Sequence, residues 1–312
     1  MLTVIVRRTL LVVPNIFLLT LMLFASVTAI LGSPAAMMLG EEASPAAINE
    51  LNARYGFDRP VLVQYADWMW RAVQGDFGRS YTTQQPVAEA LLTRVPVTLE
   101  LALASIAVAV FVAATANSIP FGRRSIGTLS STLSILGITV PNFMLGISCI
   151  FLFSVQLRWL PSTGWAPISE GLVAHLRHLV MPVATLTAFY IGSFSLVYRA
   201  EYRDVMRRLF IKVARAKGLS EIRVSFGHAL PNSILPVITY AGVSTGQLAG
   251  GAVVTETVFS IPGVGRLFVE SISTRDFPIM LAVGMLIIVA VMITNLIADL
   301  LYTVVNPQVR ID

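Results

Sequence analysis

Long apolar runs constrain this chain more than any other feature of its sequence. Several of them exceed the roughly 20 residues that a helix needs to cross a hydrocarbon core of about 30 Å. Of the 312 residues, 55% are hydrophobic and only 12% are charged, whereas charged residues make up about a quarter of a soluble domain. The composition therefore predicts an all-α, polytopic membrane protein.

Six transmembrane helices can be drawn along the chain. They are predicted at residues 9–31, 98–119, 133–157, 179–198, 234–258 and 279–302. The first follows Arg7 and Arg8 and could be a signal peptide, but it is longer than the 7–15 apolar residues of such a segment, which favours an uncleaved helix. Pro14, Pro141 and Pro182 fall within or at the start of spans, where neighbouring helices can satisfy the freed backbone groups.

The distribution of Lys and Arg predicts the orientation, because short cytoplasmic loops are enriched in these residues. With both the N- and the C-terminus in the cytoplasm, most cations fall on the cytoplasmic side. These are Arg7, Arg8, Arg123, Arg124, Arg199, Arg203, Arg207, Arg208, Lys212, Arg215, Lys217, Arg223 and Arg310. The net charge of +5 is then explained by orientation rather than by nucleic acid. The single cysteine, Cys149, lies inside an apolar run and excludes disulfides within the chain.

One long charged segment, residues 199–236, separates two apolar spans. On a helical wheel its apolar half is predicted to hold Val205, Met206, Leu209, Phe210, Val213, Ala214 and Ala216, and its polar half Asp204, Arg207, Arg208, Lys212 and Arg215, with Ile211 as an apolar exception. Lys217 and Gly218 are typical of a helix end, since glycine tolerates φ > 0. A second helix is predicted from Ser220 to Leu230. The segment is either a basic helix lying on anionic lipid or a lever for a soluble partner.

The same segment resembles the cytoplasmic "EAA" loop of ATP-binding cassette (ABC) importer permeases. The resemblance rests on Lys212-Val213-Ala214, Gly218 and His228-Ala229-Leu230-Pro231. The run ARAKGLSE at 214–221, and Asn232 to Pro236, look like the peptide and nickel branch of that family. Val213 and Pro231 depart from the pattern of that branch, where Thr and Arg are usual.

Other motifs extend the resemblance over essentially the whole chain. They are MLTVIVRR at the start, the external stretch NARYGFDRPVLVQYADWMWRAVQGDFGRSY with Gly75-Asp76-Phe77-Gly78 and Ser80, Pro141-Asn142-Phe143, and FSIPGVGRL at 259–267. The chain is therefore identified as similar to the B-type permease subunit of the dipeptide, oligopeptide and nickel ABC importers. The resemblance implies a type I importer permease fold in a bacterial inner membrane.

The resemblance also implies a site and partners. The coupling loop at 199–233 would contact an ATPase through Lys212, Val213, Ala214, Arg215, Ala216, Lys217, Gly218, Leu219, Ser220, Glu221, Leu230 and Pro231. The partners would be a homologous second permease, two ABC ATPases that hold ATP and Mg, an external solute-binding protein and membrane lipid. The cargo stays open among dipeptides, oligopeptides, nickel chelates, glutathione and opines, because selectivity would lie largely in the binding protein.

Three regions organise the predicted chain: the N-terminus and first span at 1–31, an external segment at 32–96, and the permease core at 97–312. The external segment carries enough apolar side chains for a small helical cap over the pore mouth, or it docks a partner. Residues 260–265 cannot form a regular helix and are predicted to be an external, re-entrant hairpin.

Gly242, Gly246 and Gly250 recur at i, i+4 and i+8 in the fifth span, a pattern that lets helices approach closely in lipid. We expect packing within the subunit or near the pathway, with a subunit seam as the alternative. Glu256, in the same span, is assigned with these glycines to helix packing or the pathway. Glu100, Glu256 and Asp299 lie near span ends, where snorkelling or pairing is expected rather than a relay.

The sequence lacks the motifs of an enzyme. No G-x-x-x-x-G-K-[ST] run is present, so the chain is not expected to bind ATP through a P-loop. His175 and His178 do not form a zinc pattern, and no catalytic set or metal site is predicted. The chain is therefore predicted to be a non-enzymatic pathway subunit without a cofactor of its own. One alternative is a stand-alone secondary transporter. Another is a lipid-anchored scaffold, which would explain the charge of the loop but not the six spans.

Overall fold

The computed structural model describes residues 2–32, 34–39, 44–119 and 137–305, and its regular elements in these ranges are all helical. The chain divides into two compact units, Met1–Thr98 with Pro262–Leu296, and Leu99–Ile261 with Ile297–Asp312. Two helices, α5 (Val87–Ser118) and α14 (Phe277–Val305), contribute residues to both units.

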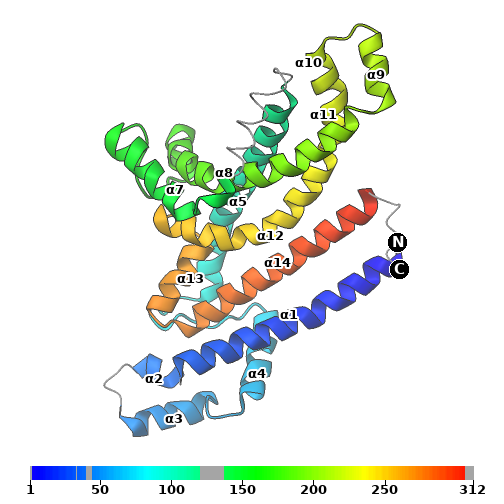
Figure 1. Ribbon diagram of the computed structural model, residues 1–312. Helices are drawn as coiled ribbons and strands as arrows, with labels where there is room; N and C mark the ends of the chain where they lie inside the picture. The colour runs from blue at the N-terminus through cyan, green and yellow to red at the C-terminus, as the bar shows by residue number, and fades with distance from the viewer. Residues whose placement is uncertain (1, 33, 40–43, 120–136, 306–312) are drawn as a thin grey trace. The chain divides into compact units, whose positions relative to one another are not determined.

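The first unit is built around α1 (Leu2–Leu31) and α14, which run side by side (Figure 1). Their approach depends on Gly284, where a Cβ atom would lie 2.5 Å from Cδ2 of Leu23. Three shorter helices follow α1 in the sequence, namely α2 (Pro34–Leu39), α3 (Pro45–Tyr55) and α4 (Val61–Val73). Phe24 packs on Trp68 of α4 and on Phe277 of α14, so all three helices share one apolar core.

A buried carboxylate fixes the loop between α4 and α5 to the start of α14. Asp276 is almost fully buried and accepts hydrogen bonds from the Ser80 hydroxyl, from Tyr81 N (3.3 Å) and from Thr82 N (3.2 Å). The turn that leads from α4 to Ser80 contains two residues in the left-handed region, Gly75 (φ 83°) and Gly78 (φ 79°). The neighbouring α13 (Val264–Ser273) packs against the first turns of α5 and against α14.

The second unit surrounds α8, its longest helix. After α5, the elements of this unit follow in chain order: α7 (Asn142–Cys149), a π-helical turn (Ile150–Gln156), a 3₁₀ turn (Ile168–Glu170), α8 (Leu172–Val205), α9 (Leu209–Ala216), α10 (Glu221–Val224), a second π-helical turn (Ser225–Ala229), α11 (Leu230–Ser233) and α12 (Leu235–Val258). Helices α7, α8 and α12 pack on one another.

Four described helices are long and apolar enough to cross a membrane: residues Leu10–Ile30 of α1, α5, α8, and residues Phe277–Ile297 of α14. The bent helix α12 makes a fifth if its two halves count as one span. Together with the all-helical elements, this supports an all-α polytopic membrane protein. The predicted third span, 133–157, begins outside the described residues, and its described part holds a shorter apolar helix, Asn142–Gln156.

The helices extend beyond the apolar runs that predict them. Helix α5 begins at Val87 rather than 98, and α8 covers Leu172–Val205 rather than 179–198. The difference arises because hydropathy marks only the part of a helix that suits lipid, whereas helical hydrogen bonding continues into the polar ends. Pro141 is the N-cap of α7, with extended backbone angles, and does not lie inside a helix.

Candidate functional site

The charged segment between α8 and α12 forms a compact helical loop in the second unit (Figure 1). Helix α8 ends at Val205, and a short turn leads to α9. Arg208 begins α9 as an N-cap in the extended region. After α9 the chain turns and re-enters helix at α10, which continues through the π-helical turn and α11 toward α12. The predicted arrangement of a helix, a bend and a second helix is confirmed.

The bend depends on Gly218, as predicted. Its φ is 78°, in the left-handed region that glycine occupies without a steric penalty. Two backbone hydrogen bonds close the end of α9: Gly218 N donates to Arg215 O (2.9 Å), and Leu219 N donates to Ala214 O (3.3 Å). This pair defines a Schellman motif, which satisfies carbonyls that the helix end leaves unpaired. Ser220 then starts α10 with extended backbone angles.

The predicted apolar face of the loop is correct for Val205 and Ala214, which are buried, and wrong for most of α9. Ile211, which the helical wheel placed among the charged residues, is fully buried together with Val205, Val224 and Ala229. Leu209, placed on the apolar face, is 74% exposed. The reason is the turn at 206–208, which separates α8 from α9 and breaks the rotational phase on which a single wheel depends.

The loop consequently presents apolar side chains outward. Leu209, Phe210 and Val213 of α9 and Ile222 of α10 are exposed, although α9 also buries Ile211. Charged residues surround them, including the exposed Lys212. A mixed apolar and charged surface of this kind is typical of a protein interface rather than of a solvated helix face.

An ion pair spans the Gly218 bend. Arg215 Nε lies 2.7 Å from Glu221 Oε1, and its Nη2 lies 3.0 Å from Oε2, a bidentate geometry that joins α9 to α10. The hydrogen bond to Glu221 raises the pKa of the Arg215 guanidinium above its ordinary value. The pair is partly exposed, so it contributes orientation more than stability.

A chain of hydroxyl groups connects the base of the loop to α5 and α8. The Ser225 hydroxyl donates to Ser118 O and bonds Tyr202 Oη, while Ser118 Oγ bonds Tyr198 Oη. The rings of Tyr198 and Tyr202 stack with centroids 5.6 Å apart. Sequence reasoning missed these residues. Tyr198 and Tyr202 share one helix face, but nothing in the sequence relates them to Ser118 and Ser225.

The other predicted loop residues occupy the same region. Ala216, Lys217 and Pro231 are exposed, Leu219 and Leu230 are half-buried, and Ala214 is buried in the loop core.

The glycines of α12 do not form one straight stripe, because the helix bends by 67° between Leu235–Gly246 and Gly250–Val258. Gly246 is buried and Gly250 is exposed. Glu256 is fully buried. The side chain of Asp299 lies outside the described part.

Glu100 pairs with a histidine. His175 Nε2 lies 2.6 Å from Glu100 Oε1, and His175 Nδ1 lies 2.8 Å from Ala166 O, on a ring that Trp165 contacts edge-on. Pairing was one of the two accounts expected for Glu100. Over the described ranges, no group of three His, Cys, Asp or Glu side chains is arranged to hold a metal ion.

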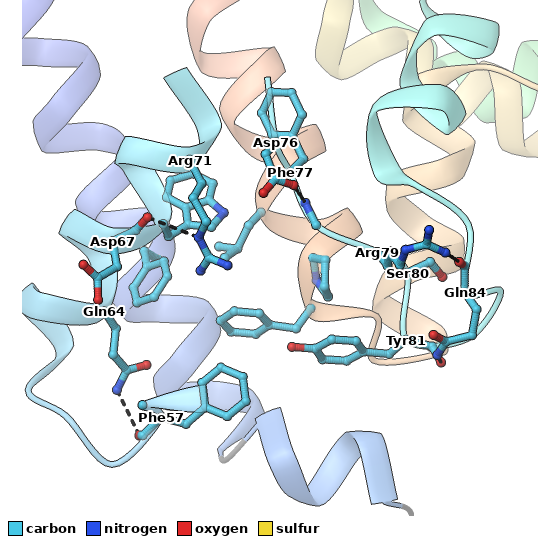
Figure 2. A pocket seen from close by; sticks show the side chains of 17 residues that line it. Phe57, Gln64, Asp67, Arg71, Asp76, Phe77, Arg79, Ser80, Tyr81 and Gln84 are labelled. Carbon is cyan, nitrogen blue, oxygen red and sulfur yellow. Dashed lines mark hydrogen bonds between the residues drawn. The ribbon is translucent and has the colours of Figure 1, made fainter. Parts of the chain in front are cut away.

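A pocket of about 370 Å³ lies in the first unit, between α4 and the loop after it (Figure 2). Gln64, Asp67 and Arg71 of α4 and Arg79 of the loop line it. Hydrogen bonds between residues close in sequence stabilise the rim of the pocket; for example, Arg79 Nη1 donates to Gln84 O at 2.9 Å. None of the predicted site residues lines this pocket. The only signal for it in the sequence is the glycine-containing run at 75–78.

Comparisons with known proteins cover the full chain. A family described as "Binding-protein-dependent transport system inner membrane component" matches residues 105–311, and the N-terminal model of such components matches residues 1–102. A putative peptide transport system permease protein of Brucella abortus is 35% identical, with 100% of both chains covered. The oligopeptide transport system permease protein AppB of Bacillus subtilis is 36% identical over 98% of both chains. The glutathione transport system permease protein GsiC of Escherichia coli is 35% identical over 99% of both chains.

Proposed function

We propose a function from the premise that this chain belongs to the family of inner membrane components of binding-protein-dependent transport systems. It is a multi-pass inner-membrane permease subunit of an ABC importer. Members of this family are membrane components of transporters rather than enzymes. A single observation carries the conclusion: full-length similarity to permeases at about 35% identity, with the family match continuing through the Gly218 loop. A stand-alone secondary transporter is therefore set aside.

The cargo that we propose is a peptide or a similar small solute. The relatives are named for peptide, oligopeptide and glutathione transport, and glutathione is itself a small peptide. The compounds in these names are all peptides, with a peptide backbone and charged ends, and we assign this chemistry to the cargo.

We assign the energy-coupling role to the loop between α8 and α12. Its exposed Leu209, Val213 and Ile222 supply an apolar surface for an ATPase subunit, and the bend at Gly218 sets the angle between α9 and α10. ATP and Mg would be held by two ABC ATPases, with a homologous second permease completing the pathway and an external binding protein delivering cargo. Closure of the ATPases would move the loop as a rigid body and so alternate access between the two sides.

The proposed topology has six spans and both termini in the cytoplasm. The described helices account for up to five spans, and the remaining segment at 133–157 is the candidate for the sixth. Labelling tests this in a Cys149→Ser background. A cysteine at the exposed Ser162 should react with a membrane-impermeant maleimide from outside, and one at Ser220 only from inside. Outside labelling of Ser220 would contradict the coupling role, because the loop would then face away from any ATPase.

Co-purification and nucleotide hydrolysis test the subunit assignment. The purified chain is expected to hydrolyse no ATP, and ATP-dependent uptake should require the nucleotide-binding subunits and the binding protein. Hydrolysis by the isolated chain that persists after contaminating ATPases are removed would overturn the assignment. Uptake driven by an ion gradient alone would instead favour a secondary transporter.

A further inference from the structure

Helix α4 of the first unit has three distinct faces, although most helices on a protein surface have two. One face packs against α1 and α14 through Trp68, Met69 and Ala72. A second, polar face of Gln64, Asp67 and Arg71 lines the pocket, as Figure 2 shows. The third face is apolar and uncovered, and it consists of Leu62, Ala66, Trp70 and Val73.

The uncovered face is continuous. Its residues recur at i, i+4, i+8 and i+11, so they follow one side of the helix. Leu62 is 66% exposed, Trp70 71% and Val73 67%. Single exposed apolar residues are ordinary, but a contiguous group marks a surface that contacts something other than water. The polar side chains of α4 are on another face and do not shield it.

Hydrogen bonds fix the depth of α4 along α1. Tyr65 Oη donates to Phe17 O (2.9 Å) and lies 2.8 Å from Thr20 Oγ1. Both partners lie inside Leu10–Ile30, the stretch of α1 that is apolar and long enough to cross a membrane. Helix α4 is therefore attached to α1 beside its membrane-crossing part and not beyond its end.

The start of α14 provides an independent depth marker. Phe24 of α1 packs on Phe277, with ring centroids 5.9 Å apart, and Phe277 is the first residue of the span Phe277–Ile297. Thr20 and Phe17 precede Phe24 by four and seven residues, which at the helical rise is about 6–10 Å along α1. Tyr65 thus lies about that far inside the level at which the α14 span begins.

The membrane-crossing helix α1 of this unit also exposes apolar side chains, on residues other than those that contact α4. Leu18 and Met22 of the α1 span are exposed apolar residues in this unit, as expected where a membrane-crossing helix meets acyl chains. An amphipathic helix in the membrane interface typically buries its apolar face about 5–10 Å below the headgroup boundary, which matches the depth of Tyr65. Tryptophan, here Trp70, is enriched at this level.

We propose that α4 is a monotopic interfacial helix, with its Leu62, Ala66, Trp70 and Val73 face in contact with bilayer lipid and its Gln64, Asp67 and Arg71 face toward the aqueous pocket. The external segment then does more than cover the pathway: it anchors that cover in one leaflet. The inference is independent of the coupling role, because it rests on the membrane location of α1 and on contacts within the first unit.

Collision accessibility of a spin label tests the proposal. In a Cys149→Ser background, the assembled transporter is reconstituted in lipid nanodiscs with a nitroxide at Trp70→Cys. Oxygen, which partitions into lipid, should relax this label more strongly than water-soluble nickel–EDDA. A label at Asp67→Cys, on the polar face of the same helix, should show the opposite order. A label at Met22→Cys on α1 supplies the lipid-facing reference.

Two outcomes would overturn the proposal. Stronger relaxation by nickel–EDDA at Trp70→Cys would place this face in water. Low accessibility to both reagents, with an immobilised spectrum, would show that a protein covers it, either the second permease or a soluble partner. A second label at Leu62→Cys keeps the test decisive if the Trp70→Cys protein does not assemble, since both positions share the face and must report the same environment.

Discussion

Replacement of Gly218 gives a graded test of the coupling loop. A Cβ atom at this position would meet no heavy atom within 4 Å, so the cost of a side chain there is conformational and not steric crowding by neighbours. The left-handed region costs an ordinary L-residue about 1–2 kcal/mol. A penalty of that size shifts a two-state equilibrium by a factor of about 5–30. Asparagine tolerates the region better than alanine does, and a β-branched residue tolerates it least.

We therefore expect ATP-dependent uptake in proteoliposomes to fall in the order wild type, Gly218→Asn, Gly218→Ala, Gly218→Val. Abundance should change little, because the spans bury their own faces away from this position. ATPase activity should be lost or no longer stimulated by loaded binding protein in Gly218→Val, since the Schellman closure between Leu219 N and Ala214 O requires the left-handed residue.

The matched control is Gly227→Ala, which places the same side chain in the same loop at a glycine without a positive φ, where the added Cβ would meet only Arg223 Cγ, at an ordinary contact distance of 4.0 Å. It should transport like the wild type. A second comparison is Arg207→Glu, a charge reversal at an exposed position of the turn before α9. If Arg207→Glu abolishes transport while Gly218→Val transports normally, the loop acts as an electrostatic membrane anchor and the lever reasoning is refuted.

Two further predictions concern exposed and buried side chains. Leu209→Asp should impair coupling to the ATPase without loss of folded protein, because Leu209 is exposed. Ile211→Ser should lower the free energy of unfolding by a few kcal/mol, because Ile211 is buried in the loop core. Equal losses of abundance in the two variants would contradict the assignment of the two faces. Asp276→Ala should lower the unfolding temperature, because it leaves the buried Ser80 hydroxyl and two backbone N–H groups without their acceptor, at about 1–3 kcal/mol for each unpaired group. Asp58→Ala, at an exposed carboxylate of the same unit, should leave the melting curve unchanged.

The parts of the fold that could be predicted from sequence are those with a local physical cause. Long apolar runs predict helices in lipid, and α1, α8 and α14 each contain one. The bend at Gly218 was predictable too, because a glycine after a cation at the end of a helical pattern has few other uses.

The buried side of α9 could not be predicted in the same way. A helical wheel assumes one unbroken helix, and neither proline nor glycine marks the turn at 206–208. Ile211 therefore appeared among charged residues although the structure buries it completely. The error is one of phase: a break of three residues rotates everything that follows it.

Pairings between distant residues were also beyond the sequence. In the sequence, Glu100 is a carboxylate near a span end, and His175 is only a histidine outside any zinc pattern. Their hydrogen bond of 2.6 Å joins positions 75 apart in the chain. Asp276 is a similar case, since its partners Ser80, Tyr81 and Thr82 lie almost 200 residues earlier.

The connections of the coupling loop indicate which spans would follow its movement. Val205, Ile211 and Val224 form one buried cluster, so the end of α8, α9 and α10 are packed as a single body. The Ser225 hydroxyl then joins this body to Ser118 O at the end of α5 and to Tyr202 of α8. A displacement applied at the exposed Leu209 face would thus reach α5 and α8 through packed side chains and hydrogen bonds, without passing through a flexible linker. Close-packed interiors transmit such displacements as rigid shifts. The lever that we propose accordingly acts on α5 and α8 first, and α12 follows through its packing against α8.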